Sequence, residues 1–188
     1  MIEVSKLSNI YKVISLNDSD ADSILKLCLD NPQFYEYSET KATKEQILKK
    51  VFLDTTPIIY FLDDNPNYSD KVEIILSHFI KQKIQIITSV ITCSEYLILP
   101  YRTNNIEKEI AFFEFLNDCK IPICQIDLNT AKLASTIRAK YNYFKAKDCL
   151  QIAFAMTHNC DLFLTNDKQL KQFNAITCLT IDDLIKEL

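Results

Sequence analysis

The sequence predicts an α/β fold in which a mainly parallel sheet carries helices on both faces, with a small β-α appendage in front. From Val51 onward, short apolar runs alternate with amphipathic helical segments, which is the pattern of a parallel sheet covered on both sides. The 188 residues can bury one good core and a small addition. We therefore expect an N-terminal extension over residues 1–48 and one α/β domain over residues 49–188.

The N-terminal extension has a character of its own. Residues 11–16 are expected to form a strand, residues 21–29 a helix and residues 31–38 an aromatic loop that starts Asn-Pro-Gln-Phe-Tyr. The stretch weakly resembles the first strand and helix of GNAT-type N-acetyltransferases, which often carry such a loop. Their acetyl-CoA loop is glycine-rich and cannot be built from a chain without glycine, so we expect an appendage rather than an acetyltransferase.

The elements of the main domain follow from apolar runs and their capping residues. Strands are expected at residues 51–53, 84–88, 121–126, 161–165 and 176–179. Helices are expected from Thr56 or Pro57 to residue 62, and over residues 69–81, 90–99, 106–119, 129–141, 146–158 and 181–188, with a short one after Asp167. Pro100 is expected to end the third of these, and the apolar segment 146–158 should lie in the core.

Composition excludes several classes of function. Without glycine the chain cannot contain a P-loop, a dinucleotide-binding turn or a G-x-S-x-G nucleophile turn. Asn117, Asn159 and Asn174 are expected to replace glycine in left-handed positions. Seven scattered cysteines and two histidines fit neither a zinc site nor a disulfide framework, so any catalytic metal must have oxygen ligands. Reduced cysteines, the absence of a signal-like apolar start and the lack of a long apolar run favour the cytoplasm.

Four acidic residues stand at comparable places in the predicted fold. Asp54 directly follows the first strand and Asp167 follows the fourth, while Glu95 and Asp148 lie in early turns of helices. Each has an ordinary alternative as a helix cap or a surface acid near a helix N-terminus. In a parallel sheet, however, all four positions lie at the carboxyl ends of the strands, where ligands bind in this class of fold.

Four carboxylates at one end of a sheet repel one another unless a cation lies between them. Mg²⁺ or Mn²⁺ resolves that conflict, since both prefer oxygen ligands and can activate water beside a phosphate. Neither histidine adjoins a serine or cysteine in a recognisable nucleophile setting. The sequence therefore predicts a metal-dependent hydrolase site.

The segments around these acids also resemble a known family. The blocks FLDTTPIIYFL, ITSVITCSEYL, AKDCLQIAFA and DLFLTNDKQL are similar, in order and approximate spacing, to the four motifs of PIN-domain ribonucleases, especially VapC-type toxins of toxin–antitoxin pairs. The resemblance spans residues 51–188. It implies that RNA phosphodiesters are hydrolysed by water activated by Mg²⁺ or Mn²⁺.

Residue by residue, the resemblance places the family's acidic quartet on Asp54, Glu95, Asp148 and Asp167. It implies that Asp54 and Asp148 bind the metal, that Glu95 positions a metal or the attacking water, and that Asp167 completes the site. The family's polar positions near the metal match Thr55 and Thr165. Possible partners are RNA, an antitoxin protein and a second copy of the chain.

Basic and aromatic residues just before Asp148 could form a track for RNA. The basic ones are Arg138, Lys140, Lys145 and Lys147, and the rings between them are Tyr141, Tyr143 and Phe144. Lys168 and Lys171 flank Asp167. The alternative is a solvated charged loop, and for the whole domain it is a noncatalytic RNA-binding or assembly module of the same fold.

Overall fold

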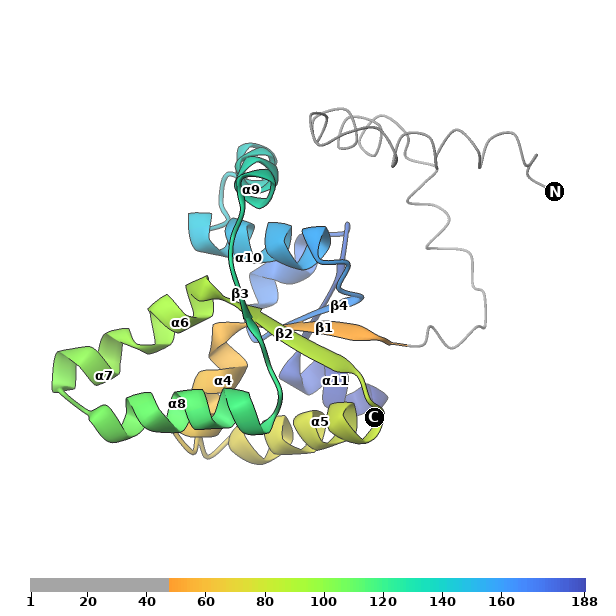
Figure 1. Cartoon of the computed structure of the whole chain (residues 1–188). Coiled ribbons are helices and arrows are strands. Elements are labelled where there is room, and N and C mark those ends of the chain that lie inside the picture. The colour runs from red at the N-terminus through yellow and green to blue at the C-terminus, as the bar shows by residue number, and fades with distance from the viewer. Residues whose placement is uncertain (1–47) are drawn as a thin grey trace. The chain divides into compact units, whose positions relative to one another are not determined.

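The computed structural model describes residues 48–188, and a five-stranded parallel sheet forms its centre (Figure 1). The strand order is β3-β2-β1-β4-β5, and every neighbouring pair is parallel. The strands are β1 (Lys50–Leu53), β2 (Gln85–Ser89), β3 (Ile123–Cys124), β4 (Leu162–Thr165) and β5 (Thr177–Thr180). The predicted α/β class, with helices on both faces of the sheet, is confirmed.

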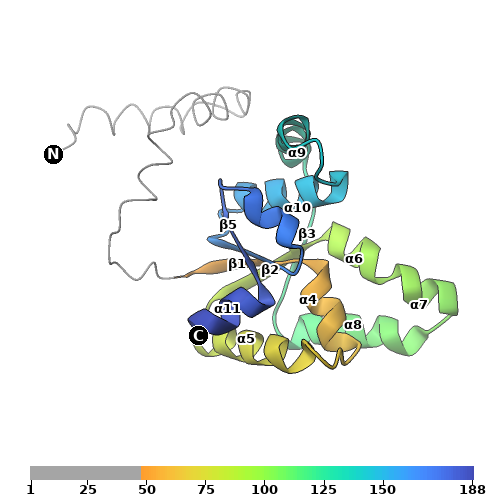
Figure 2. The same ribbon diagram turned by 180° about the vertical axis from the view of Figure 1, so that it is seen from behind.

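Helices cover the sheet in two layers, which the opposite views in Figures 1 and 2 both show. The helices on one face are α4 (Thr55–Leu62), α5 (Ser69–Lys81), α8 (Ile106–Asp118) and α11 (Ile181–Glu187). Those on the other are α9 (Leu128–Lys140) and α10 (Ala146–Thr157), together with the 3₁₀ helix η1 (Lys168–Gln172). Helices α6 (Val90–Tyr96) and α7 (Ile98–Thr103) extend from the carboxyl end of β2.

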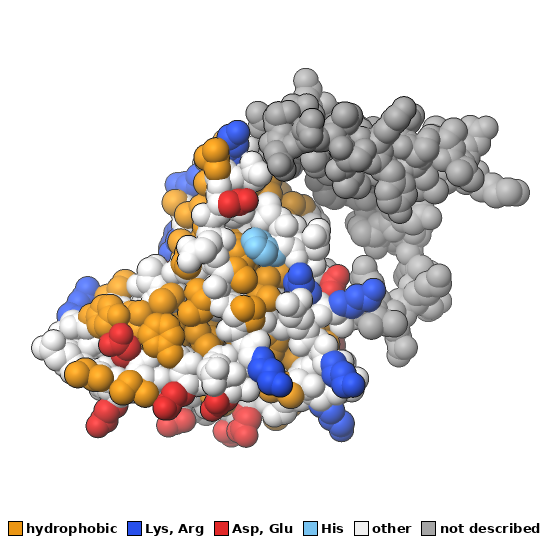
Figure 3. All heavy atoms as spheres, in the orientation of Figure 1, with side chains coloured by type: hydrophobic (Ala, Val, Ile, Leu, Met, Phe, Trp, Pro, Cys, Tyr) orange, Lys and Arg blue, Asp and Glu red, His pale blue; other side chains and the backbone are white. Residues whose placement is uncertain are grey.

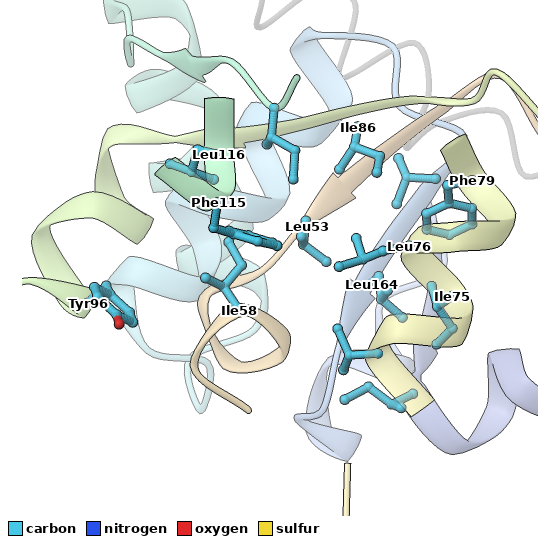
Figure 4. Close-up of a cluster of buried hydrophobic side chains, with 14 of the residues drawn as sticks. Leu53, Ile58, Ile75, Leu76, Phe79, Ile86, Tyr96, Phe115, Leu116 and Leu164 are labelled. Carbon is cyan, nitrogen blue, oxygen red and sulfur yellow. The ribbon is translucent and has the colours of Figure 1, made fainter. Parts of the chain in front are cut away.

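Strand β1 lies between two hydrophobic cores. Val51, Phe52 and Leu53 have no exposed surface, and successive side chains of a strand point to opposite faces. Leu53 therefore packs in the core under α4, α5 and α8, which Figure 4 shows with Ile58 and Phe115. Phe52 packs in the opposite core and stacks on Phe163 at 5.0 Å. Burial on both faces fixes β1 and so fixes where its last residue delivers the chain.

Two predicted boundaries are wrong for identifiable reasons. Pro100 does not end a helix but lies at the third position of α7, where a first-turn residue needs no intrahelical N–H bond. The helix predicted over residues 90–99 is instead two helices, α6 and α7, which meet at Leu97. The third strand shrinks to two residues because it pairs only with the end of β2.

The chain makes left-handed turns without glycine. Positive φ angles occur at Asp64, Lys83, Asn104, Lys120 and Asn159 among residues 48–188, so only Asn159 of the three predicted asparagines adopts one. After α5, the N–H of Lys83 donates to Ile80 and that of Ile84 donates to Phe79, which closes the helix in a Schellman arrangement. Lys83, whose side chain is exposed, takes the left-handed place that glycine usually holds there.

Two further predictions concern the N-terminal extension and the absence of a membrane-spanning segment. The predicted N-terminal extension lies outside it, apart from Leu48. Within residues 48–188, no helix combines the length and apolar character needed to cross a bilayer.

Candidate active site

Asp54 is the residue that β1 delivers to the carboxyl end of the sheet. Its N–H donates to Leu164 O at 3.0 Å, which continues the pairing of β1 with β4 by one residue. Its Oδ1 accepts from the N–H of Thr55 at 2.7 Å, so Asp54 also caps α4. Its Oδ2 accepts from the hydroxyl of Thr165 at 2.6 Å. Both the strand and the cap therefore fix the direction of this carboxylate.

Burial dominates the electrostatics of Asp54, which is only 7% exposed. Burial raises the pKa of Asp54 to about 6, although the Thr165 hydroxyl and the Thr55 amide oppose the shift. The charges of Glu95 and Asp148 raise the same pKa further. Glu95 and Asp148 thus lie close enough to Asp54 for their charges to affect its pKa.

Glu95 comes to the site from α6, and both of its oxygens have partners. Oε2 accepts from the hydroxyl of Thr55 at 2.6 Å, and Oε1 contacts the ammonium of Lys147. The Glu95 side chain is 18% exposed, so it lies along the wall of the site rather than in open water.

A buried layer of hydroxyl groups lies under Glu95. Thr88 donates to Leu53 O at 2.9 Å and lies 2.8 Å from the Thr92 hydroxyl. The amide Nε2 of Gln151 donates to Thr55 Oγ1 at 3.2 Å, and Gln151 is only 1% exposed. Through Thr55, this layer fixes the position of Glu95.

Gln151, Thr88 and Thr92 were not among the predicted site residues. Gln151 is a polar residue in an apolar helix, one turn after Asp148, and that position on the helix was a usable signal. Nothing in the sequence pairs it with α4 and α6, which lie far away along the chain.

Asp148 lies in the first turn of α10, as predicted, and is partly buried. Burial raises the pKa of Asp148, the charges of Lys147 and Lys145 lower it, and the charge of Asp167 raises it again. Asp148 therefore interacts electrostatically with both Asp54 and Asp167.

Asp167 caps η1 after the end of β4. Its Oδ1 accepts from the N–H of Gln169 at 2.8 Å, and its own N–H donates to Thr165 Oγ1 at 3.1 Å. Since Thr165 also donates to Asp54, one buried threonine connects the ends of β1 and β4. Thr165 and Thr55 both touch predicted acids, in agreement with their predicted place beside the site.

The chemical types of the oxygen ligands suit a hard divalent cation, but their positions in this structure do not form a complete coordination site. Carboxylate and hydroxyl oxygens are the ligands that Mg²⁺ and Mn²⁺ prefer. The pKa of Asp54 is raised mainly by burial, with smaller contributions from the charges of Glu95 and Asp148. In residues 48–188, no group of three or more histidine, cysteine, aspartate or glutamate side chains is arranged to hold a metal ion. The four acids therefore lie near one another without three of them converging on a single metal position.

The predicted RNA track is only partly available. Phe144 is 1% exposed and belongs to the core beside α10, so the expectation that it stacks on bases is wrong. Tyr141 stacks on Phe144 at 5.0 Å. Tyr143 is 47% exposed and hydrogen-bonds Gln172, which leaves its ring on the surface.

The predicted basic residues differ in their surroundings. Arg138 donates to Asn142 O, and Lys140 lies 5.6 Å from the centre of the Tyr141 ring. Lys145 is exposed at the N-cap of α10, and Lys147 contacts Glu95 inside the site. Lys171, which follows Asp167 in the chain, pairs with Asp183 at 2.7 Å.

Sequence comparison identifies the family. The sequence model of the family described as the PIN domain matches residues 51–176, more than half of the chain. The chain belongs to the PIN-domain family. The match begins with β1 and includes all four acids, and it does not reach residues 11–48, whose resemblance to acetyltransferases gains no support.

Solved structures with the same fold come from bacterial toxin–antitoxin complexes. A chain of VapBC2 from Rickettsia felis, bound to a promoter DNA fragment, is 17% identical with a TM-score of 0.60, and the alignment covers 70% of this chain and 98% of that one. DNA-bound VapBC from Salmonella typhimurium is 19% identical with a TM-score of 0.58, covering 71% and 99%. FitAcB from Neisseria gonorrhoeae is 21% identical with a TM-score of 0.54, covering 70% and 97%. No curated protein matches the chain significantly in sequence.

Proposed function

We propose that this PIN-domain protein is a ribonuclease that hydrolyses RNA phosphodiester bonds with the help of Mg²⁺ or Mn²⁺. The observation that carries the proposal is the buried carboxylate of Asp54 at the end of β1, whose pKa Glu95 and Asp148 both raise. Burying a carboxylate among like charges destabilises the folded protein unless a cation compensates the charge. Such carboxylates are therefore often found at functional sites. Family membership supplies the reaction class, because the PIN fold is shared with the toxin chains of similar structure.

Each acid has a proposed role that follows from its position. Asp54 and Asp148 would hold the cation, since their carboxylates have no lysine in direct contact among the described residues. Glu95 would position the cation or the attacking water, and Asp167 would complete the site beside Asp148. The bound cation would supply a lowered pKa for water and charge stabilisation at the phosphate.

RNA would reach these acids along the N-terminal end of α10. Lys145 and the ring of Tyr143 are exposed there, and Arg138 and Lys140 are exposed at the end of α9. Positive charge binds phosphates, and an exposed ring stacks on unpaired bases. With a net charge of −4, the protein depends on such a local strip rather than on its overall charge.

We further propose that the ribonuclease is a cytoplasmic toxin held in check by an antitoxin protein, and that it forms a homodimer. Helices α7 and α8 expose a set of large apolar side chains, namely Ile98, Leu99, Tyr101, Ile106, Ile110 and Phe113. Figure 3 shows hydrophobic surface gathered over α6 to α8, with acidic side chains below it. Such a patch is typical of a protein-binding surface. Residues 1–48 form a separate extension in this proposal.

A noncatalytic PIN module is the alternative, and one observation favours it. The ammonium of Lys147 already contacts one oxygen of Glu95. Such a module would bind RNA without cutting it, whatever cation is supplied.

A divalent-cation titration distinguishes the two functions. Mn²⁺ would be titrated into the wild type and Asp148→Asn by calorimetry, and cleavage of total RNA would be followed in parallel. Asp70→Asn is the matched control, because Asp70 also lies in the first turn of a helix, α5, but away from the four acids. We expect the Asp148→Asn change alone to weaken Mn²⁺ binding and abolish cleavage. Mn²⁺-independent RNA binding with no cleavage by the wild type would establish the noncatalytic module.

A further inference from the structure

Lys147 has an unfavourable position for a cation unless something nearby compensates it. It is the second residue of α10, in the first helical turn, where the helix dipole favours negative charge. Its ammonium reaches across to α6 and contacts Glu95 Oε1. The ion pair therefore connects two helices that both begin at the carboxyl end of the sheet.

The ammonium of Lys147 lies where the charges of several acids overlap. The contact with Glu95 raises the pKa of Lys147, and the charges of Glu95, Asp148 and Asp54 raise it further. These are three of the four acids of the candidate active site. Lys147 thus places a positive charge beside the acids that would attract a divalent cation.

The other lysine–carboxylate pairs of the described chain lie elsewhere. They are Lys71–Asp182, Lys108–Asp63 and Lys171–Asp183, and none includes a residue of the acidic quartet. Pairs of this kind on a surface contribute little by themselves. Lys147–Glu95 differs because its carboxylate belongs to the site.

The two partners differ in freedom to move. Glu95 is held from behind by the Thr55 hydroxyl at 2.6 Å, and Gln151 fixes Thr55 in turn. The Lys147 side chain is 48% exposed and has a long flexible stem. When a stronger cation arrives, the lysine can move into solvent while Glu95 keeps its place.

From this geometry, and resting on the metal-dependent activity proposed above, we propose that Lys147 is a built-in counterion that competes with the divalent cation for the acidic site. With no cation bound, its ammonium neutralises Glu95 and limits repulsion among the acids. A cation held by the acids would take the place of this positive charge, and the half-exposed Lys147 side chain would be free to turn into solvent. Lys147 is therefore a positioning residue that sets the concentration of cation the enzyme needs.

Mn²⁺ binding to the full chain without RNA tests the competition directly. Lys147→Met removes the competing charge, and Lys145→Met is the matched control two residues away on the exposed N-cap of the same helix. If the lost ion pair was worth up to about 1 kcal/mol, Lys147→Met should bind Mn²⁺ roughly 3- to 5-fold more tightly than the wild type. Lys145→Met should raise the affinity by less than Lys147→Met does, because the charge of Lys145 acts on Asp148 but its ammonium contacts none of the acids directly. Lys147→Arg keeps the charge and should stay near the wild type.

A double-mutant cycle shows whether the effect passes through Glu95. In the Glu95→Gln background, Lys147→Met should gain no more Mn²⁺ affinity than Lys145→Met does. Calorimetry and the electron paramagnetic resonance signal of free Mn²⁺ both report binding without reference to cleavage. Binding by Lys147→Met alone, with none by the wild type, would be the strongest form of the expected result.

Two outcomes separate failure of this inference from failure of the proposed function. If the wild type binds Mn²⁺, Asp148→Asn loses it, and Lys147→Met equals Lys145→Met, then Lys147 is not a competitor but the metal-dependent function stands. If neither the wild type nor any lysine variant binds Mn²⁺, the metal site and the competition are both overturned.

Discussion

The protein contains a lysine–carboxylate ion pair in each of two regions whose surroundings differ. At the start of α11, Lys171 contacts Asp183 at 2.7 Å, and Asp183 also accepts from the backbone and hydroxyl of Thr180 in a capping box. In the acidic site, Lys147 contacts Glu95 while Asp54 and Asp148 lie nearby. The first pair completes a helix start, whereas the second is one cation among several acids.

The pKa values express this difference. Hydrogen bonds from Lys171 and Thr180 lower the pKa of Asp183 to about 2, so its charged form is fully satisfied. Burial raises the pKa of Asp54 to about 6, so the site carries a charge that its own hydrogen bonds do not fully stabilise. The comparison teaches that local capping makes an acid structural, while burial among like charges leaves an acid ready for a ligand.

The largest expected difference between the two regions is in catalysis. Asp54→Asn removes a proposed cation ligand, so RNA cleavage should fall by roughly 100-fold or more while the fold survives. Asp183→Asn should leave the cleavage rate unchanged, although loss of the capping carboxylate should cost about 1 kcal/mol of stability. Cleavage of total RNA and far-ultraviolet circular dichroism measure both. Equal cleavage by the wild type and Asp54→Asn would remove Asp54 from the site.

The two acids should also give opposite dependences of stability on pH in the metal-free protein. The folded pKa of Asp54 is raised from 3.8 to about 6, so its contribution to stability falls as pH rises through that interval. The folded pKa of Asp183 is lowered from 3.8 to about 2, so its contribution is present above that interval and is lost as pH falls through it.

Urea unfolding in a metal chelator checks both signs. Relative to the wild type, Asp54→Asn should gain stability as pH rises from about 4 to 6, because the buried charge is absent. Asp183→Asn should lose stability relative to the wild type over the whole of that range, and the loss should shrink only under more acid conditions. A parallel pH profile for Asp54→Asn and the wild type would contradict the raised pKa.

A moderate difference between the lysines of the two regions is expected in the salt dependence of RNA binding. Neutralising Lys145 and Lys147 together should flatten the slope of log affinity against log salt by up to roughly 1.4, or about 0.7 for each phosphate that the protein no longer neutralises. Changing Lys71 and Lys171 to methionine removes the same charge at the other pairs and should leave the slope as it is. Fluorescence anisotropy with labelled single-stranded RNA measures it. Equal slopes for the two double variants would exclude a track at α10.

The smallest expected effect belongs to the structural pair alone. Lys171→Met should lower the free energy of unfolding by less than about 1 kcal/mol, because the pair is partly exposed. It should leave Mn²⁺ affinity within about twofold of the wild type, since it is screened from the acids by solvent. A change in metal affinity as large as that of Lys147→Met would erase the distinction between the regions.

Local patterns predicted much of the fold and most positions in the site. The apolar run ending at Asp54 indicated a buried strand and its exit, because burial of both faces leaves few alternatives for such a segment. The sequence also placed Asp148 in an early helical turn, as observed. The same prediction for Glu95 is wrong, because α6 ends at Tyr96 and Glu95 therefore lies in its last turn. Pro100 was misjudged, since a proline in a first turn and a proline after a helix look alike along the chain.

By itself, the sequence determined that this chain folds as an α/β domain and that acids stand at the ends of its strands and starts of its helices. Only the tertiary structure decided which groups those acids meet. Lys147 and Glu95 are 52 residues apart, Gln151 and Thr55 are 96 apart, and Phe144 belongs to the core rather than to an RNA track. The physical reason is that periodicity and capping act within a few residues, whereas the partners of a charge depend on strand order and on how whole helices pack.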